Sequence, residues 1–369
     1  MAARDGPPSS HVEALTVAGM ILQALRSIWL ILNPCQFSSD GETRATHNCG
    51  SFTASGESST GREGDYIMPA KLLDKLTAQV GFIGLGLMGS RLTRRLDSFG
   101  WHVRAWNRTP KHADELSEWG IEIARSVADL VAGADVILSS LANDDAVRSV
   151  YLDEGGVIST ARPGTIILEM STISPELSRR LHQEARAKRV NFLDVAISGS
   201  TPAVDAGTIT LLAGGDKDTF EQCVPIFESL ARQWFLIGPG SSGVRMKLVV
   251  NLLLGLDMEA IAEAVSLGEH LQIDRDVLLD VLSKTAVVAP AMGGKFRKIK
   301  DGDYSPEFPL RLMSKDMDLV MDAATASGAD LPAASVAQTV LACNVPGSGN
   351  LDLSAITPYV IGRGTKVEV

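Results

Sequence analysis

The chain has 369 residues, a formal net charge of −10 and 45% hydrophobic residues. This length suits two domains of ordinary size, and the hydrophobic content is sufficient for buried cores. The acidic balance, without any block of lysines and arginines, argues against a general nucleic-acid binder. The four cysteines form no C-x-x-C motif and no two of the six histidines are four residues apart, so we predict reduced thiols and no metal site.

The first 76 residues differ in composition from the rest of the chain. Residues 12–32 are largely apolar, but charged and polar side chains interrupt them and argue against a membrane span. Residues 38–64 are rich in Ser, Thr and Gly without periodicity, which is typical of a linker or of disorder. We therefore expect residues 1–76 to be an extension of unknown purpose, with Met68 as an alternative start. The protein is predicted to be cytoplasmic, and the targeting role of this extension is left open.

A glycine-rich turn follows the first predicted strand, residues 79–83. It is Gly84-Leu85-Gly86-Leu87-Met88-Gly89, and a helical pattern begins directly after it. A G-x-G-x-x-G turn between a strand and a helix is typical of dinucleotide binding. Its glycines allow a tight turn, a close approach of backbone to pyrophosphate and close packing of helix on strand. We predict that residues 84–89 hold the pyrophosphate at the positive end of the helix dipole.

The residues after the second predicted strand, 102–106, indicate which dinucleotide is bound. NAD-binding proteins usually carry Asp or Glu there, which accepts a hydrogen bond from the ribose 2′-hydroxyl. This chain has Asn107-Arg108-Thr109 instead, and the Arg108 guanidinium suits a 2′-phosphate. We therefore expect NADP(H) to be preferred over NAD(H). The alternative is that Arg108 is an ordinary surface arginine in a βα turn.

Strand and helix patterns alternate along the first half of the chain after the extension. Strands are predicted at 79–83, 102–106, 121–124, 135–140, 165–170, 191–197, 209–213 and 234–237. The first strands are nearly continuous apolar runs, as expected when both faces of a sheet are covered. With helical runs such as 111–119 and 175–188 between them, they favour an α/β fold with a doubly wound parallel sheet of the Rossmann type.

Only helical patterns follow Gly240, at residues 241–271, 275–282, 310–326 and 332–343. The first of these is long enough to join two domains. We predict an NADP-binding Rossmann domain at 77–240, an all-α substrate and dimerisation domain at 241–358 joined to it by that long helix, and a tail at 359–369.

Short polar residues follow several predicted strands. Ser198-Gly199-Ser200 combines hydroxyls with a glycine, which suits the binding of a small anion, although an ordinary turn is the alternative. Met170-Ser171-Thr172 and Leu141-Ala142-Asn143 are candidates to border the same crevice, the latter near the nicotinamide ribose. Because the carboxyl ends of parallel strands share one edge of the sheet, we expect these segments to lie together.

Lys247 and Asn251 are four residues apart and share one face of the long predicted helix. Ser241-Ser242 are good caps for its start. Arg245 and Lys247 lie in its first two turns, where the dipole disfavours cations, so a bound carboxylate or cofactor is one candidate to compensate them. Apolar neighbours suggest that the Lys247 ammonium reaches into a cleft, and the alternative is a lysine that snorkels at a domain boundary.

Together these motifs resemble the β-hydroxyacid dehydrogenase family, which includes 3-hydroxyisobutyrate and 6-phosphogluconate dehydrogenases. Within it, the chain is most similar to the glyoxylate/succinic semialdehyde and tartronate semialdehyde reductases. The resemblance runs from about Val80 to Ala355 and includes Phe308 and Lys315-Asp316, a pair that in isolation suggests only an exposed ion pair. Where many members have Gly, this chain has Ser200, so its substrate preference is expected to differ.

The resemblance implies an NADPH-dependent interconversion of a small carboxylate-bearing aldehyde and its hydroxyacid, with Lys247 as the general acid and base. The candidate substrates are glyoxylate, succinic or tartronate semialdehyde, and 3-hydroxyisobutyrate. The resemblance assigns substrate binding to Ser198, Gly199, Ser200, Thr172 and Asn251, and cofactor binding to Gly84, Leu85, Gly86, Leu87, Met88, Gly89, Asn107, Arg108, Thr109, Leu141, Ala142, Asn143, Thr172 and Lys315.

The resemblance also implies a homodimer or homotetramer. Two other functions remain open at this point. The first is imine reduction on the same architecture, although related imine reductases generally carry another residue in place of Lys247. The second is a catalytically silent NADP-binding scaffold, which the unusual extension favours and Lys247 disfavours.

Overall fold

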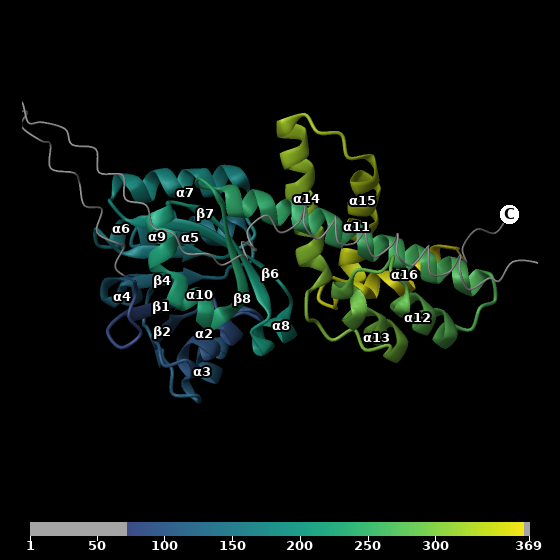
Figure 1. Ribbon diagram of the computed structural model, residues 1–369, viewed down its shortest axis with the longest axis horizontal. Helices are drawn as coiled ribbons and strands as arrows, with labels where there is room; N and C mark the ends of the chain where they lie inside the picture. Colours follow the sequence, from purple (N-terminus) through teal and green to yellow (C-terminus); the bar gives the residue numbers. More distant parts are fainter. Residues whose placement is uncertain (1–71, 365–369) are drawn as a thin grey trace, which may run out of the picture. The chain divides into compact units, whose positions relative to one another are not determined.

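The computed structural model describes residues 72–364, so most of the predicted extension, including Met68, lies outside the described part (Figure 1). Its first half is an eight-stranded sheet with the order β3-β2-β1-β4-β5-β6-β7-β8. The strands are β1 (Gln79–Ile83), β2 (His102–Trp106), β3 (Glu122–Ile123), β4 (Val136–Ser139), β5 (Ile166–Glu169), β6 (Asn191–Ser198), β7 (Ile209–Gly215) and β8 (Ala231–Gly238). All eight predicted strands are present, and their ends differ from the prediction by at most a few residues.

The first six strands run parallel, which confirms the doubly wound Rossmann sheet. The strand order reverses between β1 and β4, and ligands of such sheets bind where the order reverses, beyond the carboxyl ends of the strands. β7 runs antiparallel to β6, and β8 pairs parallel with β7. The connection from β6 to β7 passes through the short helix α8 (Thr201–Ala206), and a parallel crossover needs about a dozen residues or more. The chain therefore reverses direction at this point.

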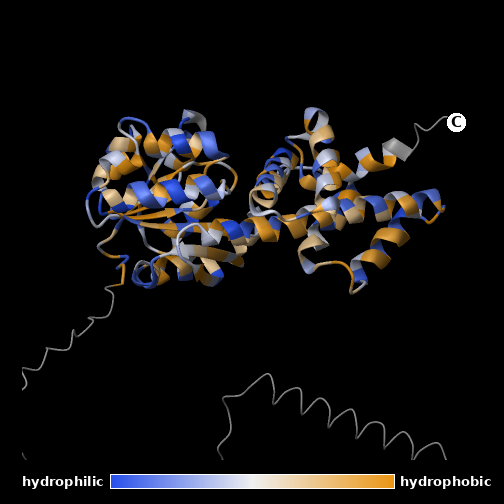
Figure 2. Cartoon of the chain, turned by 90° about the horizontal axis from the view of Figure 1, so that it is seen from above, coloured by the Kyte–Doolittle hydropathy of each residue, from blue (hydrophilic) through white to orange (hydrophobic). Residues whose placement is uncertain are grey.

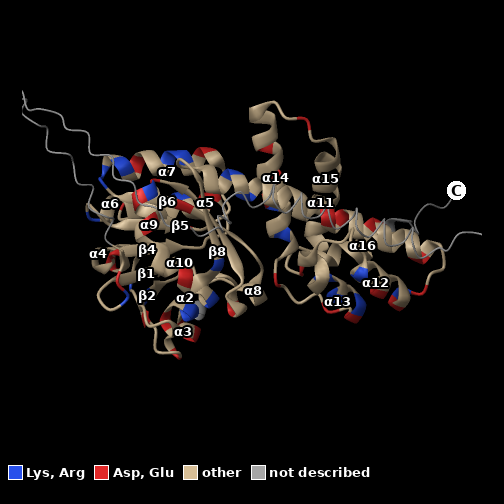
Figure 3. Ribbon diagram, viewed as in Figure 1, with Lys and Arg blue, Asp and Glu red and all other residues tan. Residues whose placement is uncertain are grey.

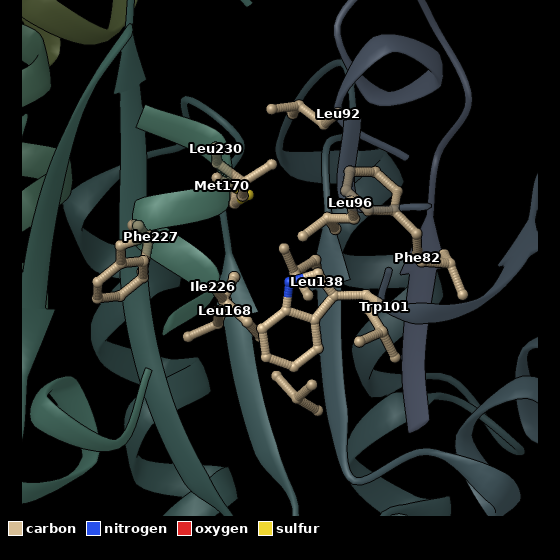
Figure 4. Close-up of a cluster of buried hydrophobic side chains, with 14 of the residues drawn as sticks. Phe82, Leu92, Leu96, Trp101, Leu138, Leu168, Met170, Ile226, Phe227 and Leu230 are labelled. Carbon is tan, nitrogen blue, oxygen red and sulfur yellow. The ribbon is translucent and has the colours of Figure 1, made fainter. Parts of the chain in front are cut away.

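Helices cover both faces of the sheet. They are α2 (Gly89–Ser98), α3 (Pro110–Ser117), α4 (Val127–Gly133), α5 (Asp144–Leu152), α6 (Val157–Thr160), α7 (Pro175–Ala187), α8, α9 (Lys217–Gln222) and α10 (Val224–Leu230). Successive strand residues point to opposite faces. Phe82 belongs to a buried cluster that also contains Leu96 of α2 and Phe227 of α10 (Figure 4), whereas its neighbour Ile83 belongs to a second cluster that contains Tyr151 of α5. The strands are accordingly hydrophobic on both faces (Figure 2).

The remaining described residues are helical and enclose a third core around Met258, Met313 and Leu341. The helices are α11 (Ser242–His270), α12 (Arg275–Lys284), η1 (Pro290–Met292), α13 (Gly293–Asp301), α14 (Leu310–Ser327), α15 (Pro332–Ser348), η2 (Leu353–Ala355) and α16 (Ile356–Gly364). The sequence pattern did not predict α13 or α16, because short helices depend on tertiary packing more than on local propensity. None of the described helices combines the length and the apolar character needed to cross a bilayer.

Candidate functional site

The turn after β1 requires glycine at two positions, because a side chain there would collide with the protein's own backbone. Gly84 has φ of +93°, and a Cβ there would collide with the carbonyl oxygen of Ser140 at the end of β4. A Cβ at Gly89 would collide with the carbonyl oxygen of Gly84. At Gly86, in contrast, no atom lies within 4 Å of where a Cβ would stand. Gly86 therefore leaves room for a group from outside the protein.

The backbone of this turn offers unused donors. The N–H groups of Gly86, Leu87 and Met88 have no acceptor within residues 72–364, and they stand at the N-terminus of α2. Free N–H groups and the positive end of a helix dipole fit a pyrophosphate. The N–H of Leu85 is used differently, because it donates to Asn107 Oδ1 over 2.9 Å.

The turn after β2 is joined to the glycine turn by Asn107. Its Oδ1 accepts from Leu85, and its Nδ2 donates to the carbonyl of Thr109 over 2.9 Å. Arg108 and Thr109 are exposed beside it. The Arg108 guanidinium forms no hydrogen bond or ion pair with any other described residue. Asn107 thus shapes the turn, while Arg108 is available to an external anion.

A pocket of about 230 Å³ lies beyond the carboxyl ends of the strands, beside α11 and α14. Ten of the predicted residues line it: Gly86, Leu87, Met88, Gly89, Leu141, Ala142, Thr172, Gly199, Lys247 and Lys315. The structure therefore brings together the glycine turn, three of the predicted loops and the lysine of the long helix. Such a convergence of polar groups in a cleft at this edge of the sheet is typical of a binding site.

Several other predicted residues do not line this pocket. Asn143 accepts from the N–H of Ala146 over 2.9 Å and so caps α5. Ser198 and Ser200 flank Gly199, which has φ of +145° and does line the pocket. Asn251 is fully buried.

Lys247 is the buried cation of the pocket. Its side chain is 8% exposed, and its Nζ makes no hydrogen bond or ion pair with another described residue. The pKa of Lys247 is lowered to about 8, mainly by burial; the Asp316 carboxylate raises it and the Lys315 ammonium lowers it by smaller amounts. The group is therefore present in both protonation states near neutral pH, as a proton donor and acceptor must be.

A short network connects Lys247's neighbours. Asn251 Nδ2 donates to Asp316 Oδ2 over 2.6 Å, whereas its buried Oδ1 has no partner in the described part of the chain. Lys315 Nζ lies 2.6 Å from Asp316 Oδ1 and donates to the carbonyl of Thr172 over 2.6 Å. Asp316 is 2% exposed, so this pair is not the exposed ion pair that the sequence in isolation suggested.

The start of α11 is capped by a residue far away in the sequence. Ser241 has φ of +70° and makes no side-chain cap, so the expectation that Ser241-Ser242 cap the helix is wrong. The carboxylate of Asp194, on β6, instead accepts from the N–H groups of Ser241 and Val244, each over 2.8 Å. The Asp194 carboxylate thus offsets the positive end of the α11 dipole.

Glu169 ends β5 beneath the pocket and was not singled out from the sequence. It is fully buried, and burial raises the pKa of its carboxyl to about 8. Its Oε1 accepts from the N–H of Ser171, and Ser171 Oγ in turn accepts from the N–H of Leu141 over 2.8 Å. Glu169 therefore links the two loops that border the pocket. The sequence feature that could have identified Glu169 is its position as the one charged residue, at the end of the otherwise apolar strand β5.

The α14 side of the pocket was identified in part. The sequence analysis named Phe308, Lys315 and Asp316, and it missed Glu307, Pro309, Arg311 and Leu312. Arg311 lies four residues before Lys315, and this spacing places both on one face of a helix. The helical spacing thus offered a way to find Arg311 from the sequence.

Comparisons with known proteins cover both halves of this site. Residues 79–238 match the model of the NAD binding domain of 6-phosphogluconate dehydrogenase, and residues 241–360 match that of NAD-binding of NADP-dependent 3-hydroxyisobutyrate dehydrogenase. Glyoxylate/succinic semialdehyde reductase 1 from Arabidopsis thaliana is 33% identical over 283 residues, which are 76% of this chain and 98% of that protein. NAD-dependent L-serine dehydrogenase from Pseudomonas aeruginosa is 35% identical over 266 residues, covering 70% and 89% respectively.

A solved structure of a 3-hydroxyisobutyrate dehydrogenase is also similar to this chain. The 3-hydroxyisobutyrate dehydrogenase of Mycobacterium tuberculosis with L-serine is 31% identical, with a TM-score of 0.67. The match covers 77% of this chain and 99% of that one. The similarity therefore includes the sheet, the long helix and the helices that border the pocket.

Proposed function

Since the chain belongs to the β-hydroxyacid dehydrogenase family, we propose that it interconverts a small carboxylate-bearing aldehyde and its hydroxyacid, with NADP(H) as the redox partner. The observation that carries the proposal is Lys247, a buried lysine that has no partner within residues 72–364 and shares a pocket with the glycine turn. Glyoxylate, succinic semialdehyde, tartronate semialdehyde and 3-hydroxyisobutyrate are the compounds of this class to test.

The proposed chemistry divides between cofactor and protein. The cofactor supplies hydride to the aldehyde carbon. The Lys247 ammonium donates a proton to the carbonyl oxygen, and its neutral amine accepts that proton in the opposite direction. The Oδ1 of Asn251, one turn along α11 and without a partner among the described residues, is the acceptor that we expect to orient the ammonium when substrate binds.

Substrate binding is proposed for the loops on the sheet side. Gly199 and its neighbours Ser198 and Ser200 bind the carboxylate through N–H and hydroxyl groups. Thr172 lies at the junction of substrate and nicotinamide, and its carbonyl holds Lys315 over the cofactor. The buried position of Lys247 excludes water from the proton-transfer step.

The direct test is NADPH oxidation with this panel of aldehydes, and NADP⁺ reduction with the corresponding hydroxyacids. We expect turnover in both directions with at least one pair. Purified protein that binds NADPH yet turns over none of these compounds would contradict the proposal and favour the cofactor-binding scaffold.

The NADP preference is proposed on Arg108, because the names of the relatives include both NAD and NADP. Replacing Arg108 with alanine should raise the KM for NADPH about tenfold to a hundredfold, the effect of one lost charge-assisted hydrogen-bonding group. The KM for NADH should stay unchanged, because NADH has no 2′-phosphate. Equal effects on both cofactors would contradict the role.

The glycine turn allows a matched pair of variants. Gly89→Ala should lower the melting temperature and abolish NADPH binding, because its Cβ collides with the Gly84 carbonyl. Gly86→Ala should leave the melting temperature unchanged and still weaken NADPH binding, because its Cβ points into the space for the pyrophosphate. Thermal unfolding measures the melting temperature of each variant, and equilibrium titration measures its affinity for NADPH. Unweakened binding by Gly86→Ala would place the pyrophosphate elsewhere.

The pH dependence should differ in sign between the two directions. Aldehyde reduction requires the Lys247 ammonium, so its kcat/KM should be level below about pH 8 and fall above it. Hydroxyacid oxidation requires the neutral amine, so its kcat/KM should rise up to about pH 8 and then level off. Profiles that change in the same direction, or that persist unchanged in Lys247→Ala, would assign the titration to another group.

A further inference from the structure

The charges that line the pocket do not balance. Three cations face it, Lys247, Lys315 and Arg311, and two anions, Glu307 and Asp316. Asp316 pairs with Lys315. The carboxylate of Glu307 lies 3.5 Å from Lys298 Nζ and 3.8 Å from Lys295 Nζ, and neither of these two lysines lines the pocket. Within residues 72–364, Lys247 and Arg311 are therefore left without a counter-ion.

Arg311 is held in place by one side of its guanidinium. Its Nε donates to Asn350 Oδ1 over 3.0 Å, and its backbone N–H donates to the Gly349 carbonyl over 3.0 Å. Its two terminal nitrogens have no partner in the described part of the chain. Arg311 is exposed, and its two free terminal nitrogens are in the planar arrangement that suits bidentate binding of a carboxylate.

The position of Arg311 sets it apart from the reacting group. It precedes Lys315 by four residues of α14, or ~6 Å along the helix axis. Apolar side chains of Phe308, Pro309 and Leu312 line the same side of the pocket. A short hydrocarbon segment can therefore lie against these residues, with one anionic group near Lys247 and another at Arg311.

We propose that Arg311 makes the pocket selective for substrates that carry a second carboxylate, in addition to the one beside the reacting carbon. The inference rests on the proposed function, since it names the substrate class of that same site. The residue determines specificity through binding and takes no part in proton transfer.

Two hydroxyacids that differ by one carboxylate test this selectivity. They are 3-hydroxyisobutyrate and 2-(hydroxymethyl)succinate, which share the reacting CH₂OH group and the adjacent carboxylate. With NADP⁺, we expect kcat/KM of the wild type to be at least about tenfold higher for the dicarboxylate. Arg311→Ala should remove this preference, so that kcat/KM becomes similar for the two hydroxyacids. Arg311→Lys should retain part of it, because a lysine provides charge without the planar fork.

Two further variants serve as controls. Arg297 is an exposed arginine of α13, a helix rich in basic residues, and it does not line the pocket (Figure 3). Arg297→Ala should therefore keep the full preference. Asn350→Ala frees the Arg311 guanidinium without removing it and should weaken the preference partially, with KM for NADP⁺ unchanged.

Binding of each hydroxyacid to the NADP⁺-loaded protein, measured by calorimetry, separates this inference from the proposed function. Turnover of 3-hydroxyisobutyrate without a preference for the dicarboxylate would overturn the role of Arg311 alone. Arg311-dependent binding of the dicarboxylate without turnover would support Arg311 and contradict the proposed reaction. A rise in the KM for NADP⁺ in Arg311→Ala, shared by both hydroxyacids, would assign Arg311 to the cofactor and overturn the inference.

Discussion

Replacing Lys247 with alanine is expected to lower the turnover number about a hundredfold or more, because it removes the positioned proton donor. NADPH affinity should remain unchanged, since the turn at residues 84–89 is intact. The fold should also persist, because Lys247 has no partner among the described residues whose loss would leave a buried group unpaired. Steady-state kinetics with NADPH titration by fluorescence measures both quantities.

Lys247→Arg distinguishes proton transfer from simple electrostatic attraction. Arginine keeps the charge but does not give up its proton near neutral pH. If Lys247 transfers a proton, the arginine variant should be nearly as impaired as the alanine variant. If it only attracts the carboxylate, the arginine variant should retain most activity. Lys284→Ala, at an exposed lysine of α12, is the matched control and should behave as wild type.

Replacing Asp194 with alanine is expected to lower the free energy of unfolding by about 3–5 kcal/mol, as breaking a buried charged network does. The carboxylate is fully buried and accepts from Ser241 N–H, Val244 N–H and, over 2.7 Å, His182 Nε2. Its loss removes the carboxylate that accepts from two N–H groups at the start of α11. Urea denaturation without cofactor measures the effect.

The control for Asp194 is another aspartate that caps a helix. Asp216 accepts from the N–H of Thr219 over 2.9 Å at the start of α9, but it is exposed. Asp216→Ala should cost only about 1 kcal/mol, the usual cost of a lost cap. Asp194→Asn should fall between the two, because a neutral amide has a single acceptor oxygen. Equal losses for Asp194→Ala and Asp216→Ala would show that burial of the Asp194 network adds nothing.

The strands were predictable because each one is recognised from the apolar character of its own consecutive residues. A strand buried on both faces must be apolar almost throughout, and residues such as 80–83 and 136–139 show this directly. The glycine turn was equally visible, since its chemistry lies within six consecutive residues. The direction of β7 depends instead on the length of the connection through α8, which the sequence pattern of each strand does not contain.

The site was only partly predictable because its contacts cross long stretches of chain. Lys247 was identified from its neighbours on one helix, whereas the partner of Asn251 is Asp316, from a different helix. The cap of α11 by Asp194 joins a strand to a helix, so the nearby serines were a wrong but locally reasonable choice. Contacts of this kind are set by tertiary packing and leave no periodic pattern.

The hydrogen bonds of Asn107 constrain how this protein can change its cofactor. Its side chain joins the turn after β2 to Leu85 in the glycine turn, so a change in the conformation of one turn is transmitted to the other. If the two turns bind the pyrophosphate and the ribose as proposed, a substitution at Asn107 is expected to disturb both. Arg108 has no such attachment within the described residues. A substitution at position 108 can thus change the preference between NADP and NAD without altering the glycine turn. A substitution at position 107 would alter the glycine turn at the same time.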